Sequence, residues 1–87
     1  MRASHILVQT LNEAVHLKVQ LNEGADFGDL ARQHSKCPSG ANGGDLGEFP
    51  PGAMVQPFEE ATLATAIGKI SQPVQTQFGY HLIQRTG

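Results

Sequence analysis

The sequence predicts an α+β fold, in which a small and largely antiparallel sheet is covered by short helices. Segments with the character of strands and helices follow one another in the order β-α-α-β-α-β-β, and the last two strands are close enough to pair as a hairpin. The chain has 87 residues, of which 39% are apolar, and this suffices for one small core. We therefore assign residues 1–87 to a single domain.

The first half of the chain predicts one strand and two helices. Residues 5–9 are β-prone and precede polar residues, so we expect a strand there. Over residues 11–23 the apolar positions recur with a helical period, and Gly24 follows where a helix end favours glycine. Asp26 can cap a second helix over residues 27–34.

The second half predicts four more elements. In chain order these are a strand, a helix and two strands, at residues 46–49, 58–67, 71–74 and 80–85. Pro57 suits the first turn of the helix, and Gly68 ends it. A turn near residues 77–79 allows the last two strands to pair. Residues 39–44 contain too much glycine for a regular element.

Composition argues against several classes of protein. Charged residues make up 16% of the chain and the net charge is -2, which disfavours both disorder and nucleic-acid binding. No run approaches the roughly 20 apolar residues of a membrane span, and residues 1–10 lack the apolar core of a signal peptide. Cys37 is the only cysteine, so no intramolecular disulfide forms and a reducing compartment fits best. We expect a cytoplasmic monomer without nucleic-acid or membrane partners.

Three polar side chains and one apolar set could carry chemistry. His5 begins the first strand and His81 lies in the last. Side chains on neighbouring strands approach to about 5 Å, which permits an imidazole–imidazole hydrogen bond. Cys37 lies on the loop after the second helix, from which a thiol can reach across the sheet. The apolar set, which could be a pocket or plain core, is Leu46, Met54, Phe58 and Phe78.

Other chemical interpretations are weaker. A single histidine or cysteine is usually structural, and His34 with Cys37 is only half of a zinc ligand set. A Cys–His hydrolase needs a residue that orients the histidine and an oxyanion hole, for which Gly43 and Gly44 could supply backbone donors. However, 87 residues is very small for such an enzyme. We expect neither a metal nor a cofactor.

Four segments carry a further pattern and together span nearly the whole chain. They are SHILV at residues 4–8, FGDLARQHSKCPSGANGGDLG at 27–47, GAMVQPFE at 52–59 and PVQTQFGYHLI at 73–83. In sequence and order these segments resemble the parvulin-type peptidyl-prolyl cis/trans isomerases, and most closely the minimal single-domain parvulins.

This resemblance implies a four-stranded antiparallel sheet surrounded by about four short helices, one of them near residues 39–42. It assigns the paired active-site histidines to His5 and His81. Cys37 takes the central polar position, and the Thr76 hydroxyl orients the histidine pair. The proline pocket would be lined by Leu46, Met54 and Phe58, with Phe78 as additional apolar wall.

The resemblance also implies an enzyme that isomerises X–Pro bonds in unfolded or flexible polypeptides. These bonds isomerise in tens to hundreds of seconds unaided, because rotation disrupts the amide resonance. We expect Cys37 to lie beside the rotating carbonyl without attacking it, and the adjacent histidines to be neutral because two imidazolium ions repel. The alternative function is a non-catalytic binding or chaperone module for extended proline-containing segments.

The connection after the first strand bears on the choice of substrate. Residues 9–13 contain neither Lys nor Arg, so no cationic fork is available there for a phosphate. We therefore expect activity that does not depend on phosphorylation, with the residue before proline selected loosely by apolar contacts.

Overall fold

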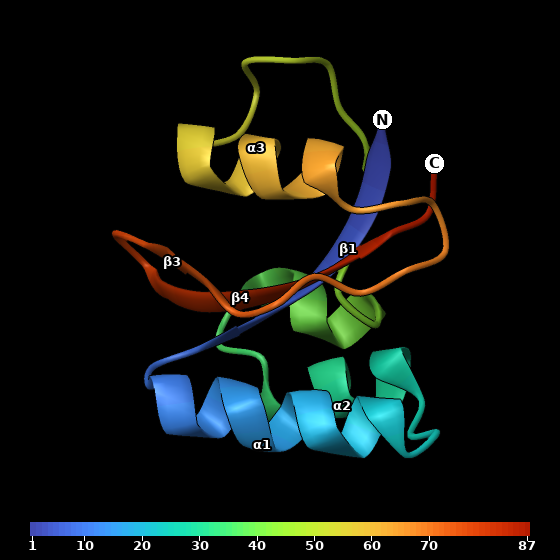
Figure 1. Ribbon diagram of the computed structural model, residues 1–87, viewed down its shortest axis with the longest axis vertical. Coiled ribbons are helices and arrows are strands. Elements are labelled where there is room, and N and C mark those ends of the chain that lie inside the picture. The colour runs from blue at the N-terminus through green and yellow to red at the C-terminus, as the bar shows by residue number, and fades with distance from the viewer.

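The computed structural model describes all residues, 1–87, and it has the predicted α+β architecture. Its elements in chain order are β1 (Arg2–Val8), α1 (Leu11–Asn22), α2 (Phe27–His34), the 3-10 helix η1 (Pro38–Asn42), β2 (Asp45–Glu48), α3 (Gln56–Ala64), β3 (Val74–Thr76) and β4 (Gly79–Arg85). The sheet lies between α3 on one side and α1 and α2 on the other (Figure 1). None of these helices has the length and apolar character needed to cross a bilayer.

The sheet has four strands in the order β2-β1-β4-β3, and every neighbouring pair is antiparallel. Because side chains alternate along a strand, each face of the sheet has its own core. Ile6, Val8 and Leu82 are fully buried in the core between the sheet and helices α1 and α2. Ala3 and Ile83 point to the opposite face and join the core formed with α3. This second face carries the candidate site.

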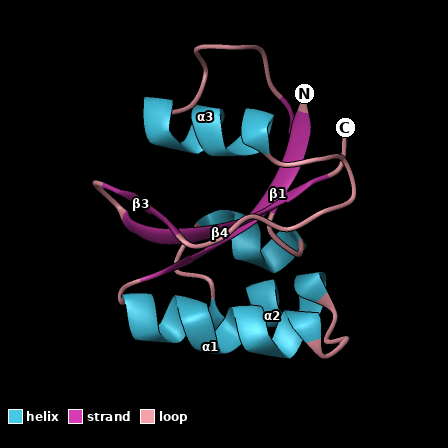
Figure 2. Ribbon diagram, viewed as in Figure 1, coloured by secondary structure: helices cyan, strands magenta, loops and turns pink.

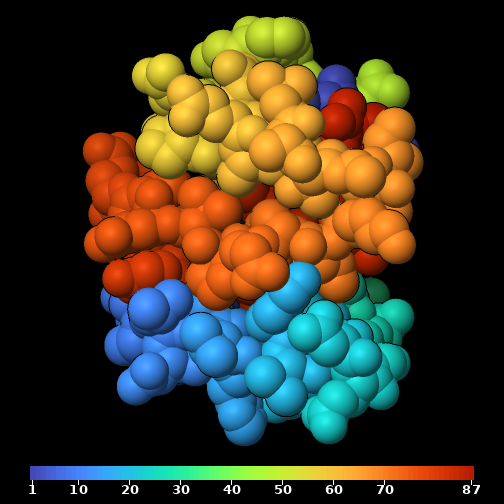
Figure 3. Space-filling model, viewed as in Figure 1, coloured from blue at the N-terminus to red at the C-terminus, as the bar shows by residue number.

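The two helices of the first half begin at the predicted residues because local side chains cap them. The Thr10 hydroxyl accepts a hydrogen bond from the Glu13 N–H at 3.2 Å, and the Asp26 carboxylate accepts one from the Asp29 N–H at 3.0 Å. Each of these bonds satisfies a backbone donor that has no partner within the helix. The space-filling view shows α1, in blue, packed against the C-terminal segments of the chain, in orange (Figure 3).

The third helix ends earlier than predicted, at Ala64 instead of Ile67. Thr65 adopts an extended conformation, and its hydroxyl donates to the Ala61 carbonyl oxygen at 2.6 Å. This side-chain bond replaces the backbone bond that a further helical residue would make. The long loop between β2 and α3 lies on the α3 side of the sheet (Figure 2).

The glycine-rich segment forms the short helix η1, as the resemblance implied and glycine content did not. Its end is attached to β1, since the His5 N–H donates to the Gly44 carbonyl oxygen at 2.9 Å. Gly44 has a φ of 83°, and a Cβ there would overlap the His5 carbonyl oxygen. Only glycine allows this approach of two backbones, which holds η1 beside the candidate site.

The strand predicted at residues 71–74 lies further along the chain, at Val74–Thr76. Ser71 instead pairs irregularly with β4, where its N–H donates to the Ile83 oxygen at 2.7 Å and its hydroxyl accepts from the Ile83 N–H at 3.1 Å. Pro73 then has no N–H to offer to a ladder. Regular pairing starts after it, and Gln77 and Phe78 form the two-residue turn of the predicted hairpin.

Candidate active site

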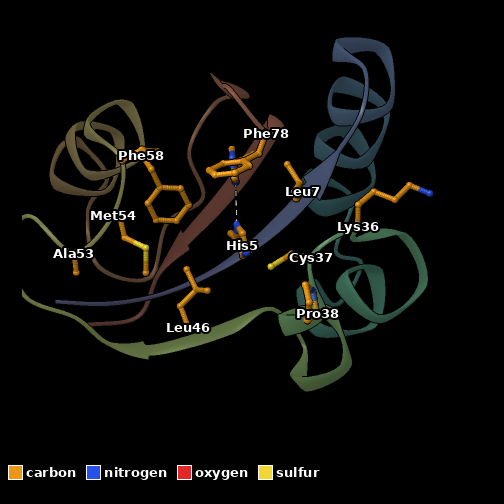
Figure 4. Close-up of a pocket in the computed structure, with 12 residues that line it drawn as sticks. His5, Leu7, Lys36, Cys37, Pro38, Leu46, Ala53, Met54, Phe58 and Phe78 are labelled. Carbon is orange, nitrogen blue, oxygen red and sulfur yellow. Dashed lines mark hydrogen bonds between the residues drawn. The ribbon is translucent and has the colours of Figure 1, made fainter.

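A mostly apolar pocket of about 490 Å³ opens on the α3 side of the sheet, between β1, α3 and the start of η1 (Figure 4). Of the eight predicted site residues, seven line this pocket, namely His5, Cys37, Leu46, Met54, Phe58, Phe78 and His81. The eighth, Thr76, lies behind His81 and contacts it. The fold therefore collects residues from both ends of the chain around one cavity.

The two histidines form a hydrogen-bonded pair in the wall of the pocket. His5 Nδ1 lies 2.9 Å from His81 Nδ1, and the rings are nearly parallel, with an interplanar angle of 17°. In the register of the sheet His81 lies opposite Leu7, so the pair is diagonal across β1 and β4. Both side chains are buried.

Hydrogen bonds extend this pair in both directions. His81 Nε2 lies 2.7 Å from Thr76 Oγ1, which also accepts from the Phe78 N–H at 3.2 Å. On the other side, His5 Nε2 lies 3.1 Å from the Ser39 hydroxyl. Ser39 in turn donates to Cys37 Sγ at 3.3 Å. A continuous chain of hydrogen bonds therefore connects the hairpin turn to the cysteine.

The direction of each hydrogen bond along this chain follows from the one that Ser39 donates to Cys37. Because the Ser39 hydroxyl donates to Cys37, its oxygen is free to accept from His5 Nε2–H. A neutral imidazole has one donor and one acceptor nitrogen, so His5 Nδ1 accepts from His81 Nδ1–H. His81 Nε2 then accepts from the Thr76 hydroxyl. With these tautomers no buried side-chain polar atom lacks a partner.

Burial keeps both imidazoles uncharged. Burial, together with the charge that His81 would carry, lowers the pKa of His5 to about 4. Burial also lowers the pKa of His81. Phe58 reinforces this environment, since its ring lies edge-on to both imidazoles, at centroid distances of 5.5 Å from His5 and 5.3 Å from His81.

The apolar wall has a buried part and an open part. Phe58 is 3% exposed and belongs to the core shared with Ala3 and Ile83. Met54 and Leu46 are half-buried against the same core. Phe78 is 56% exposed at the tip of the hairpin, above the His5 ring in Figure 4. The wall can therefore hold an apolar ring at one end while the other end stays open to a chain.

Ser39 is the functional candidate that sequence reasoning missed. It belongs to the glycine-rich segment, whose glycine content predicted no regular element, and a serine in such a segment resembles any loop serine. The only available signal was its position two residues after Cys37. The structure also contains no cluster of three or more His, Cys, Asp or Glu side chains that could hold a metal ion.

Comparison of the sequence with known proteins finds a matching family and similar relatives. Residues 5–87 match the family described as Rotamase, PPIC-type PPIase domain. The chain is 50% identical over 86 residues to the foldase protein PrsA of Geobacillus sp. (strain WCH70), an alignment that covers 98% of this chain and 31% of that protein. The chain therefore spans about a third of the length of this curated relative.

Two solved structures extend the comparison to the fold. The crystal structure of the peptidylprolyl isomerase PrsA from Bacillus anthracis superposes with a TM-score of 0.99 at 50% identity, covering all of this chain and 41% of that one. The solution structure of NmPin, the parvulin of Nitrosopumilus maritimus, superposes with a TM-score of 0.90 at 41% identity, covering all of this chain and 95% of that one.

Proposed function

Because the chain belongs to the PPIC-type peptidyl-prolyl cis/trans isomerase family, the parvulins, we propose that its pocket accelerates the rotation of X–Pro bonds without a covalent intermediate. The observation that carries this proposal is the neutral, hydrogen-bonded pair of His5 and His81 beside Cys37 in an apolar pocket. The substrates are proline-containing segments of unfolded or flexible polypeptides.

The apolar end of the pocket supplies the first part of the mechanism. Leu46, Met54 and Phe58 hold the proline ring and exclude water from the imide. In the twisted transition state the prolyl nitrogen localises its lone pair, and the carbonyl oxygen loses part of its negative charge. A dry environment favours this less polar form over either planar form. An acceleration of a thousandfold corresponds to about 4 kcal/mol of such preferential binding.

The polar residues position the rotating carbonyl rather than attack it. A nucleophilic thiol needs a base in direct contact. Here the hydrogen bond at Cys37 Sγ comes from the Ser39 hydroxyl, and the thiol is connected to the His5 imidazole through that hydroxyl. The histidine pair fixes Ser39, and Ser39 fixes the thiol. This arrangement supports a steric and electrostatic role for Cys37.

Phosphorylation of the substrate is not required under this proposal. Only Gln9 and Thr10 separate β1 from α1, and neither carries a charge. A phosphate bound there would meet no guanidinium fork, which is the group that recognises phosphate with two parallel hydrogen bonds.

We also propose that the domain acts as a monomer, that it works in the cytoplasm, and that it has no nucleic-acid or membrane partner. The pocket is completed by residues of a single chain, which supports action as a monomer. The free thiol of Cys37 is suited to a reducing compartment. Sedimentation of the purified protein and fractionation of its source cells test these two points.

Magnetisation exchange by NMR tests the proposed activity directly. In a short Ala-X-Pro-Phe peptide, cis and trans signals exchange too slowly to transfer magnetisation without a catalyst. We expect exchange to appear when a catalytic amount of the protein is added, and to fall strongly with the His81→Ala variant. Peptide shifts that move while exchange stays at the uncatalysed rate would instead support the binding-module alternative.

A further inference from the structure

Lys36 is the only residue lining the pocket that carries a charge at neutral pH. The other lining side chains are apolar, except for Cys37 and the two neutral histidines. The Lys36 side chain is exposed and has no hydrogen bond or acidic partner, since the two salt bridges of the protein are Arg2–Asp45 and Arg32–Asp29. A free ammonium group therefore lies at the rim of an otherwise uncharged cavity.

The backbone holds Lys36 in this position. Its N–H donates to the Leu7 carbonyl oxygen of β1 at 2.7 Å. The neighbouring Ser35 hydroxyl accepts from the Leu7 N–H at 3.1 Å and from the Cys37 N–H at 3.3 Å. The segment between α2 and η1 is thus attached to the central sheet, and Lys36 stays beside Cys37. Only its flexible stem remains free to move.

The position of Lys36 relative to the proline subsite determines which part of a substrate it meets. Ala53 and Met54 lie at one end of the pocket, Lys36 lies at the other, and Cys37 lies between them (Figure 4). When the proline ring occupies the apolar end, the rotating carbonyl lies at Cys37. That carbonyl belongs to the residue before proline, so this residue lies on the side of the pocket where Lys36 is.

We propose that Lys36 gives the domain a preference for substrates with Asp or Glu immediately before proline. This inference rests on the proposed function, because it assumes that proline occupies the apolar end. No Asp or Glu lines the pocket to compete for the ammonium group. A carboxylate before proline therefore gains an attractive partner, whereas Lys or Arg at that position is repelled. The structure thus adds a charge preference to the apolar selection that the sequence predicts.

The expected size of the preference is modest, because the ammonium group is exposed. Exposed ion pairs of this kind correspond to about two- to fivefold in an equilibrium or rate constant. Salt screens them, since the Debye length falls from about 8 Å at physiological ionic strength to about 3 Å at 1 M.

Two peptides that differ only in charge test the proposal. Acetylated and amidated Ala-Glu-Pro-Phe and Ala-Gln-Pro-Phe are compared by kcat/KM from NMR exchange. We expect the Glu peptide to be favoured about two- to fivefold by the natural protein, and the ratio to approach one with Lys36→Gln or in 1 M NaCl. Lys69→Gln removes the same charge from an exposed residue outside the pocket and should leave the ratio unchanged.

Several results would overturn the proposal. They are a ratio of one in the natural protein, a ratio that survives Lys36→Gln, and a ratio that is unchanged in 1 M NaCl. Failure of the proposed function has a different signature, since acceleration of the Gln peptide measures catalysis alone. If neither peptide is accelerated, the same ratio is measured as a ratio of Kd by shift titration. A Lys36-dependent preference there upholds the inference even though catalysis is absent.

Discussion

His5 Nδ1 lies 2.9 Å from His81 Nδ1, although the two residues are not opposite each other in the sheet. His81 lies opposite Leu7, and the rings meet diagonally across the two central strands. A hydrogen bond between two Nδ1 atoms requires one of them to lack a proton. Double protonation therefore breaks the pair, and the burial that keeps it neutral makes the fold sensitive to acid.

The first prediction concerns stability as a function of pH. The pKa of His5 is about 4 in the folded state and about 6.5 when unfolded, so between these values the unfolded chain binds more protons. The contribution of neutral His5 to the free energy of unfolding is present above pH 6.5 and is lost as the pH falls toward 4. From His5 alone we expect a loss of about 2 kcal/mol in the free energy of unfolding between pH 7 and pH 5.

Urea denaturation at pH 7 and pH 5 measures this loss. His5→Asn should reduce the difference between the two pH values, whereas the exposed His16→Gln should leave it unchanged. An equal pH dependence in His5→Asn and the natural protein would show that the buried pair does not control the acid response.

The second prediction concerns Cys37, which accepts a hydrogen bond from Ser39. An aspartate at this position can accept the same bond, whereas alanine cannot. Cys37→Asp should therefore retain more isomerase activity than Cys37→Ala in the NMR exchange assay. The reverse order would indicate that the thiol acts covalently.

The third prediction concerns Ser39 as a positioning residue between His5 and Cys37. Ser39→Ala removes both hydrogen bonds, and we expect kcat/KM to fall about fivefold, the effect of roughly 1 kcal/mol. The His5 ring should also lose its fixed tautomer, which ¹⁵N chemical shifts of the imidazole report. Ser39→Thr keeps the hydroxyl and should restore both readouts. Unchanged ring shifts in Ser39→Ala would contradict this role.

The fourth prediction separates two aromatic residues of the pocket by burial. Phe58 is 3% exposed and part of the core, so Phe58→Ala should lower the free energy of unfolding by about 3–5 kcal/mol. Phe78 is 56% exposed, so Phe78→Ala should change it by no more than about 0.5 kcal/mol and still weaken peptide binding. Denaturation and shift titration of both variants measure the two effects. Normal peptide affinity in Phe78→Ala would remove Phe78 from the binding surface.

The fifth prediction concerns phosphorylated substrates. With Lys36 as the single cation at the pocket, a phosphoserine before proline should be turned over no more than about fivefold faster than serine. Exchange rates of the paired peptides test this, with Lys36→Gln as the control. A gain of two orders of magnitude would require a phosphate site that the short β1–α1 connection does not supply.

The sequence by itself determined the elements that local signals specify. α2 occupies the predicted residues because a capping Asp26 and one apolar face define it without help from distant residues. The proximity of side chains on neighbouring strands, together with the family resemblance, predicted the pairing of His5 with His81 and named the apolar residues that line the pocket.

The tertiary structure decided whatever depends on contacts between distant segments. β3 begins after Pro73 because Ser71 bonds to Ile83 of β4, a partner that no local pattern identifies. Ser39 joins the site only because Gly44 lets η1 approach β1 closely enough for its hydroxyl to reach His5. Periodicity and capping act over a few residues, whereas a hydrogen bond between side chains 34 residues apart exists only once the whole sheet has formed.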